Sequence, residues 1–366
     1  MRKYPSLYYR SHPAHARKKR RGGFGIAEIM IATFIAAVAI SLLLSMMVSM
    51  MQTNQTEQAR SGVSDDMRRA MLYMTGDIRE ATYVYNGDQL TQTRPDVANL
   101  GSLTSYLPSF GANVQPILAF WKVENLPYDG IGSFPATSNA GCATLFSGND
   151  PLINECQTTI IERRAYTLVV YTLSTNNSAN AWDGESRIER YTLRKYTNLA
   201  TLTRSPGYVD PVRDSGFDRW PFGAGNTNIQ VNAAGMTNTR ATLVDFVSRP
   251  QVFPLQSRNP PQCPTDILRN PDGTAVTNAA GQQIRTYVPS PYSDPAINAT
   301  RVTPTSVNSF FACVMNDGGV IPGNQDVIVY LTGNAKGRPG IEKDSIIDPL
   351  QGRVAAKGIV GKSVPD

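Results

Sequence analysis

Histidine is almost missing from the sequence. Of the 366 residues only His12 and His15 are histidines, and both lie in a basic segment at the N-terminus. The rest of the chain therefore lacks the parts for a Ser-His-Asp triad, a Cys-His pair or a His-ligated zinc site. Because the commonest catalytic apparatus is absent, we expect a protein that is not an enzyme.

Acidic residues are missing from the first 23 positions. Residues 1–23 contain eight Lys and Arg residues, which leaves 27 basic against 29 acidic residues in the remainder. The formal net charge of +6 therefore comes from this segment, and the rest of the chain carries −2. This distribution gives little support to nucleic-acid binding by the body of the protein.

Cysteine is scarce, and no two cysteines form a CxxC pair, so the usual zinc-site spacing is absent. The four cysteines are Cys142, Cys156, Cys263 and Cys313. An even number of cysteines in an exported region predicts two disulfides. Of the three pairings we favour Cys142–Cys156 and Cys263–Cys313, because they close the shortest loops. Free buried thiols are the alternative.

Glycine and proline are absent between Gly25 and Gly62, and this stretch contains a long apolar run. Ile29 to Met51 spans 23 residues whose only polar members are one threonine and three serines. As a helix it would be about 35 Å long, enough to cross a bilayer. The basic residues before it predict a cytoplasmic N-terminus and a body on the other side.

Small side chains recur every four residues along this run, at Thr33, Ala37, Ser41, Ser45 and Ser49. Such a ridge allows two helices to approach closely in apolar surroundings. The alternative is that small residues are simply frequent in membrane helices, and the sequence does not favour one over the other.

A second helix is predicted beyond the membrane segment. After the polar stretch "QTNQTEQARSG" Ser64 can cap a restarted helix that ends near Tyr83. Its apolar stripe comprises Val63, Met67, Ala70, Met71, Met74 and Ile78. We expect this stripe to pack on a sheet, because methionine-rich stripes are far more often core than ligand grooves.

After Asn86-Gly87 the pattern changes to short strand-like runs between turn-rich segments. The runs are Ile117 to Val123, Thr158 to Ser174, Arg187 to Tyr196, Ala241 to Val247 and Asp326 to Thr332. Residues 200–240 and 250–305 read as long irregular stretches. We predict an α+β fold: a long N-terminal helix packed on an antiparallel β-rich head. Its parts are a basic leader (1–23), a membrane helix (24–52), an amphipathic helix (53–86) and the head (87–366).

Signals for metal or nucleic acid are weak. The segments "NPDG" (270–273) and "MNDGG" (315–319) offer oxygen ligands for calcium but lack the full spacing of a calcium loop, and tight turns explain them better. We therefore expect no cofactor. The basic-aromatic "YTLRKY" (191–196) is compatible with DNA contact, although a solvated strand face is the default.

The junction "RKKRRGGFGIAEIM" identifies the segment more closely. A secretory signal peptide is the first alternative, but here the Gly-Gly pair precedes the apolar run and the run continues into a helix. A basic leader, then Gly23, Phe24 and Glu28, then about twenty apolar residues resembles the class III signal of type IV prepilins and pseudopilins. The resemblance implies cleavage between Gly23 and Phe24 by a prepilin peptidase and N-methylation of Phe24.

Glu28 has a physical role on this interpretation. A carboxylate near hydrocarbon is costly unless it is paired. Cleavage would create an amine at Phe24, about one helical turn away, and a neighbouring subunit could supply the same group. The pair would then set the register between packed helices. The alternative is a Glu that snorkels to the interface from an ordinary anchor.

The resemblance extends to minor pilins of the PilW type and to J-type pseudopilins. Similar segments are "MRRAMLYMTGDIREA", "IERYTLRKY", "TLVDFVSRPQVF" and "DVIVYLTGNAKGR", which together cover about half of the chain. Major pilins often interrupt the membrane helix with Pro or Gly, and this sequence has neither there, which puts local melting of the helix during assembly in question.

Three functions compete at this stage. The first is a minor pilin that primes or caps a type IV pilus, with roles in adhesion, twitching motility or DNA uptake. The second is a J-type pseudopilin of a type II secretion system, and the third is a membrane-anchored surface adhesin or enzyme. The first implies other major and minor pilins, the prepilin peptidase and an inner-membrane assembly platform as partners. It also implies an inner-membrane protein that later reaches the pilus, the cell surface or the periplasm.

Overall fold

The computed structural model describes residues 25–91, 100–175, 181–249, 261–270, 272–277, 281, 283–291, 309–315 and 325–358. The chain divides into two compact units, Met1–Asn54 and Gln55–Asp366. The second unit contains two antiparallel sheets and a small two-stranded ribbon, together with the last part of the long helix. The predicted α+β class is therefore confirmed.

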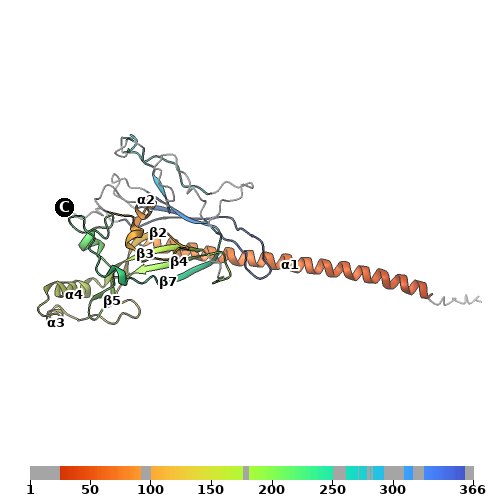
Figure 1. The fold of residues 1–366 in the computed structure, drawn as a ribbon, viewed down its shortest axis with the longest axis horizontal. Helices are drawn as coiled ribbons and strands as arrows, with labels where there is room; N and C mark the ends of the chain where they lie inside the picture. The colour runs from red at the N-terminus through yellow and green to blue at the C-terminus, as the bar shows by residue number, and fades with distance from the viewer. Residues whose placement is uncertain are drawn as a thin grey trace, which may run out of the picture. The chain divides into compact units, whose positions relative to one another are not determined.

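Helices and strands alternate irregularly along the chain (Figure 1). The helical elements are α1 (Ile26–Arg79), α2 (Gly87–Thr91), η1 (Leu103–Tyr106), α3 (Asn139–Leu145), α4 (Asp150–Glu162), η2 (Pro211–Ser215) and η3 (Ala233–Gly235). The strands are β1 (Ala81–Tyr85), β2 (Val114–Asn125), β3 (Arg164–Thr175), β4 (Ser186–Leu193), β5 (Tyr196–Asn198), β6 (Thr203–Arg204), β7 (Arg240–Val247), β8 (Tyr287–Ser290), β9 (Phe310–Met315), β10 (Asp326–Leu331) and β11 (Leu350–Ala355).

Helix α1 is continuous over 54 residues. The predicted restart at Ser64 is wrong, because the polar stretch before it contains good helix formers and no proline, and Gly62 stays inside the helix. The helix also ends at Arg79 and not near Tyr83. Alternating β-branched and aromatic residues follow, and they form strand β1, so the sheet begins inside the segment predicted as helix.

The larger sheet has the order β1-β2-β3-β4-β7, and every neighbouring pair is antiparallel. Strands β2, β4 and β7 correspond to predicted runs, and their ends differ from the predicted ends by at most three residues. The predicted antiparallel pairing of the two middle runs is confirmed, with Val170 opposite Tyr191. In Figure 1 these strands lie side by side above the labels α4 and β5.

The predicted run Thr158 to Ser174 is only half strand. Its first residues belong to helix α4, whose N-terminus is capped by the Asn149 side chain, which accepts from the Leu152 amide at 3.3 Å. The helix ends at Arg163 in the left-handed conformation with φ of 52°. Capping outweighs the strand propensity of the Thr-Thr-Ile-Ile run here, because propensity is a weak prior.

The smaller sheet has the order β11-β10-β9-β8. Strand β10 corresponds to a predicted run, whereas β8, β9 and β11 were not predicted, and β8 lies within a stretch that was read as irregular. Gln325, next to β10, links the two sheets. Its side-chain amide donates to the Val84 carbonyl at 2.8 Å and accepts from the Val84 amide at 2.9 Å, as a neighbouring strand would.

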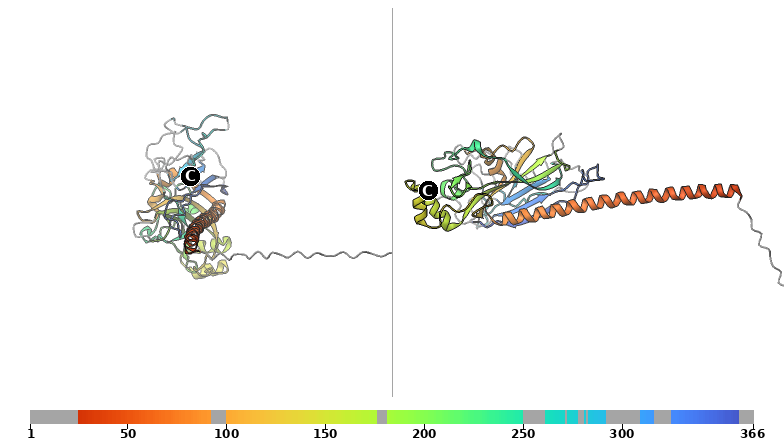
Figure 2. Two further views of the ribbon diagram at one scale, coloured as in Figure 1. Left: turned by 90° about the vertical axis from the view of Figure 1, so that its right-hand side faces the viewer. Right: turned by 90° about the horizontal axis from the view of Figure 1, so that it is seen from below.

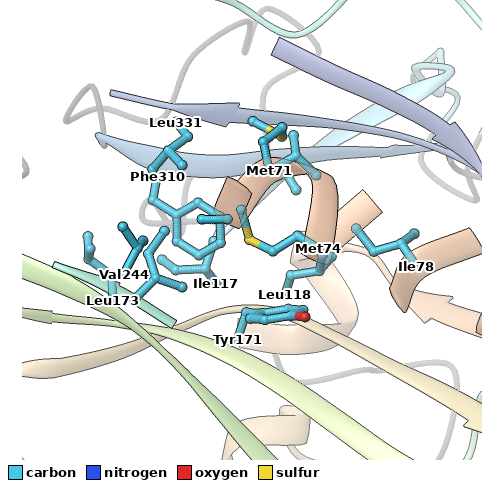
Figure 3. Close-up of a cluster of buried hydrophobic side chains, with 14 of the residues drawn as sticks. Met71, Met74, Ile78, Ile117, Leu118, Tyr171, Leu173, Val244, Phe310 and Leu331 are labelled. Carbon is cyan, nitrogen blue, oxygen red and sulfur yellow. The ribbon is translucent and has the colours of Figure 1, made fainter. Parts of the chain in front are cut away.

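The main core lies where α1 meets the two sheets. The buried stripe of α1 is Val63, Met67, Ala70, Met71, Met74 and Ile78, which is the stripe predicted from the sequence. Figure 3 shows Met74 reaching toward Phe310 of the smaller sheet, near Ile117 of the larger one, while Met71 lies against the strands of the smaller sheet. In Figure 2 the orange end of α1 lies beside the blue strands of the smaller sheet. Side chains from three elements therefore share one core.

One acid breaks this apolar stripe. Asp77 is buried, and its carboxylate accepts from Lys122 Nζ at 2.6 Å, from Arg190 Nε at 2.8 Å and from Tyr171 Oη at 2.8 Å. Burial alone would raise the pKa of Asp77, but the hydrogen bonds and charges of Arg190 and Lys122 outweigh it and hold the pKa below its ordinary value. The three partners come from β2, β3 and β4, so one carboxylate fastens α1 to three strands.

We expect the substitution Asp77→Ala to lower the free energy of unfolding by about 3–5 kcal/mol, because it removes the counter-ion of the half-buried Arg190 and leaves the buried Lys122 only Glu80 at 3.3 Å and Glu124 at 3.9 Å. Urea unfolding of the full chain in detergent micelles measures the loss. Asp65→Ala, on the exposed side of the same helix, is the control and should stay within about 0.5 kcal/mol of wild type. Equal effects of the two variants would refute the role given to Asp77.

The same contacts predict a dependence on pH. Because the folded pKa of Asp77 is lowered, its stabilisation is complete above the unfolded pKa of about 3.9 and is lost as the pH falls through the folded value. The difference in unfolding free energy between wild type and Asp77→Asn should therefore be largest at neutral pH and shrink below about pH 4. Urea unfolding at pH 7 and pH 3 tests this, and a difference that does not change with pH would contradict it.

Candidate functional site

The first half of α1 exposes its apolar side chains. All 16 large hydrophobic residues from Ile26 to Met51 are between 45 and 81 % exposed. In the described part of the second unit, by contrast, few large apolar residues are exposed. Exposed apolar area of this extent marks a surface that is covered by lipid or by other protein.

By length and composition, α1 is the one helix of the described residues that could cross a membrane. Its most apolar 18-residue window has a mean hydropathy of 2.5, and none of that window is buried within the chain. This is weak evidence for a single membrane anchor, since a signal sequence would pass the same test.

Two of the four hydroxyl groups on the predicted ridge of small residues donate to the helix backbone. Thr33 Oγ1 donates to the Met30 carbonyl at 3.0 Å, and Ser41 Oγ donates to the Ala37 carbonyl at 2.8 Å. These bonds satisfy the hydroxyl donors inside the helix and leave a shallow face that apolar neighbours can approach.

Glu28 lies in the first turn of this helix. Its Oε2 accepts from the Gly25 amide at 3.3 Å, and its own amide donates to the Gly25 carbonyl at 3.0 Å. An acid at the third helical position that reaches back to the residue before the helix is half of a capping box. Within the described residues no cation forms an ion pair with Glu28. The predicted cleavage residues Gly23 and Phe24 lie outside the described residues.

The cysteines form two disulfides, Cys142–Cys156 and Cys263–Cys313, which is the favoured pairing. The first joins α3 to α4, and the second joins the 261–270 segment to β9. They lie in separate apolar clusters of the second unit, so they stabilise different parts of the head.

The bases of "YTLRKY" bind acids of the chain itself. Lys195 Nζ lies 3.0 Å from Asp210 Oδ2 and 3.4 Å from Glu155 Oε1, and its side chain is only 9 % exposed. Arg194 Nε donates to Glu124 Oε2 at 3.0 Å. Both cations are thus partly or fully neutralised within the head, which leaves little charge here for a nucleic-acid backbone.

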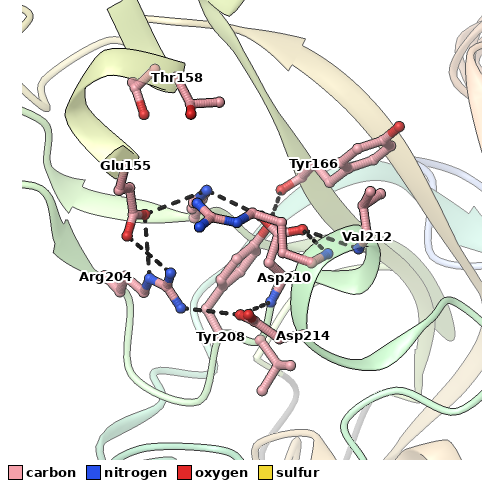
Figure 4. Close-up of polar contacts among 12 residues, drawn as sticks. Glu155, Thr158, Tyr166, Arg204, Tyr208, Asp210, Val212 and Asp214 are labelled. Atoms are coloured by element: carbon pink, nitrogen blue, oxygen red, sulfur yellow. Dashed lines mark hydrogen bonds and ion pairs between the residues drawn. The ribbon is translucent and has the colours of Figure 1, made fainter. Parts of the chain in front are cut away.

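Glu155 organises a second buried polar cluster (Figure 4). Arg204 Nη2 donates to Glu155 Oε2 at 2.9 Å, and Tyr196 Oη donates to Glu155 Oε1 at 2.8 Å. Burial would raise the pKa of Glu155, but the hydrogen bond from Arg204 and the charge of Lys195 hold it below its ordinary value. The basic residues therefore keep Glu155 in its charged form. The hydrogen bonds from Tyr196 and Arg204 also connect α4 to the β5–β6 ribbon.

Arg204 and Asp214 of this cluster also line a pocket of about 220 Å³. Arg204 Nη1 lies 3.2 Å from Asp214 Oδ2, so the two charges at the pocket are already paired. The other walls include Val209, Ile229 and Val231. The pocket therefore offers an apolar wall and a neutralised ion pair.

The structure shows no set of calcium ligands at the described part of the two candidate segments, 270–273 and 315–319. Asp272 Oδ1 accepts from the Thr274 amide at 2.9 Å and from Thr274 Oγ1 at 2.6 Å, which is a turn held by an aspartate. Residues 316–319 lie outside the described residues. Within the parts that the structure describes, no three His, Cys, Asp or Glu side chains gather as metal ligands would.

No family model, no curated protein and no solved structure matches the chain. Interpretation of the site therefore depends on its own residues.

Sequence reasoning missed Asp77, although a signal was present. Asp77 is three residues after Met74 and seven after Ala70, so it lies on the apolar face of the predicted helix. A lone acid on such a face implies cationic partners in the core, and here these are Lys122 and Arg190.

Proposed function

We propose that the chain is a minor type IV pilin, a structural subunit that primes or caps the assembly of a pilus. The observation that carries the proposal is the character of α1. Its first half exposes an unbroken apolar surface, while the second half of the same helix contributes the central stripe of the head's core. One helix therefore contributes both to the core of the folded head and to an apolar surface that suits a helix bundle.

The mechanism follows from the two halves. The first half holds the subunit in the inner membrane as a single-pass protein, and on assembly it exchanges lipid contacts for contacts with the helices of other pilins. Other major and minor pilins are thus the partners in the bundle. Before assembly, the partners are the prepilin peptidase and the assembly platform.

Glu28 supplies the register in this proposal. Among the described residues, its carboxylate accepts one hydrogen bond, from the Gly25 amide at the long distance of 3.3 Å. Cleavage after Gly23 creates a cationic amine at Phe24, and the amine of the same or of a neighbouring subunit can bind the carboxylate. A buried pair of this kind discriminates strongly against shifted registers, because an unpaired charge in apolar surroundings is costly.

A J-type pseudopilin of a type II secretion system is the second candidate, since it would use the same helix and the same acid. A surface adhesin on a membrane anchor explains the apolar helix but gives no reason for Glu28 at its start. The pilin proposal therefore accounts for more of the sequence, and the genes beside this one would separate it from the pseudopilin.

The maturation step gives the first test. Mass spectrometry of the protein purified from membranes should show a mature N-terminus at Phe24 that carries one methyl group. An intact N-terminus, or a cut after Met51, would rule out the prepilin interpretation.

The register role gives the second test. Glu28→Ala should remain in the membrane but enter sheared pili at least about tenfold less than wild type, if the lost pair contributes about 1.4 kcal/mol or more. Immunoblots of the membrane and pilus fractions measure this. The matched control is Glu57→Ala, an exposed acid of the same helix beyond the apolar run. Normal incorporation of Glu28→Ala would refute the role.

A further inference from the structure

Strand β11 has an open edge. Among the described residues it is the last strand of its sheet and pairs with β10 alone, in the register Val327 opposite Val354. The Ala356 amide donates to the Gln325 carbonyl at 2.8 Å, which fixes the phase of the ladder. Alternate residues of an antiparallel strand point their backbone groups to opposite sides. The amides and carbonyls of Gln351, Arg353 and Ala355 therefore face away from β10.

The edge of the larger sheet at β1, by contrast, is covered by a side chain of the protein itself. There the Gln325 side chain occupies the edge of β1 and binds both backbone groups of Val84. At β11 no side chain or strand of the described residues takes that place. An open row of backbone donors and acceptors is a template for another extended chain.

Helix α1 forms one wall beside this edge. A carbon added to Gly352 would lie 2.6 Å from Met71 Sδ and 2.9 Å from Thr75 Cγ2, so the strand backbone touches this flank of the helix. Arg68 and Leu72 stand seven and three residues before Thr75, and Arg79 stands four residues after it, so all three lie on the same side of the helix as Thr75. Leu72 is 73 % exposed, the most exposed large hydrophobic residue of α1 within the head.

The residues beside the β11 edge are basic, which favours an acidic segment as the binding partner. Arg68 and Arg79 are exposed, and neither forms an ion pair with a described residue. Arg353 projects from the centre of the edge with a side chain that is 65 % exposed, and it is held by Asp326 at 2.6 Å. Two β11 edges joined antiparallel about their centres would place Arg353 opposite its own copy, and like charges directly opposite destabilise a sheet. The edge therefore disfavours a second copy and favours an acidic strand.

We propose that the free edge of β11 binds an extended segment of a partner protein, in which carboxylates alternate with apolar side chains. The segment adds a fifth strand to the smaller sheet. The carboxylates lie on the α1 flank near Arg68 and Arg79, and the apolar side chains lie on the other face of the sheet, because successive residues of a strand point to opposite faces. The inference does not depend on filament assembly, because it concerns the head alone.

The test uses the full chain in detergent micelles and a ten-residue peptide that alternates valine and glutamate. A peptide with lysine in place of glutamate is the comparison. The glutamate peptide should bind at least about tenfold more tightly by fluorescence anisotropy, a difference of about 1.4 kcal/mol. Hydrogen exchange at residues 350–355 should slow at least about tenfold at saturation.

Variants of the protein distinguish the contribution of backbone hydrogen bonds to peptide binding from that of the charged side chains. Gln351→Pro removes an outward-facing amide and no hydrogen bond to β10, so it should abolish the protection while the fold remains. Arg68→Glu combined with Arg79→Glu should reverse the preference, so that the lysine peptide binds more tightly. The same reversal at Arg213, an exposed base on η2, should leave the preference unchanged.

Several results would overturn the inference. These are equal binding of the two peptides, unchanged exchange at saturating peptide, and full protection of the edge in the free chain, which would mean that the chain's own residues cover it. Protection that rises with protein concentration in the absence of peptide would point to a second copy, and would overturn it as well.

Discussion

The contact of the Asp77 carboxylate with Lys122, Arg190 and Tyr171 is the constraint on which the head depends. Apolar side chains alone would allow α1 to rotate or slide by small steps over the sheet, because dispersion and burial are not directional. A buried carboxylate with partners on three strands is directional, and it permits one rotation of the helix. The ion pair is costly to bury, so its contribution is to specificity more than to stability.

Fixing the rotation of α1 also decides what the head presents to solvent. With Asp77, Met74 and Ile78 turned inward, the stripe that contains Arg68 and Leu72 must face outward. The same rotation places Met71 and Thr75 against the backbone of Gly352, where a larger side chain would not fit. The basic flank of α1 beside β11 is therefore a consequence of one interaction in the core.

Sequence reasoning succeeded where the periodic pattern was long and failed where it was short. The stripe of α1 and the runs of β2, β4, β7 and β10 were predicted, because many residues in each agree on one period. The end of α4 was read as strand, since a cap at Asn149 and a disulfide at Cys156 are stronger than the local propensity of four residues. Strand β11 was missed because an edge strand with Gly352 and Arg353 has little of the apolar alternation that marks a strand.

Two acids on α1 illustrate how a helix can serve a core and an assembly at once. Asp77 finds its cations within the chain, and its pKa is lowered accordingly. Glu28 lies among exposed apolar residues and binds only a backbone amide of the described chain. An acid that is costly in apolar surroundings and has no cationic partner among the described residues is stabilised when a cation is supplied from outside them. In the proposed function the new amine at Phe24 is that cation, so the assembly interface is completed only by the cleavage that makes the subunit mature.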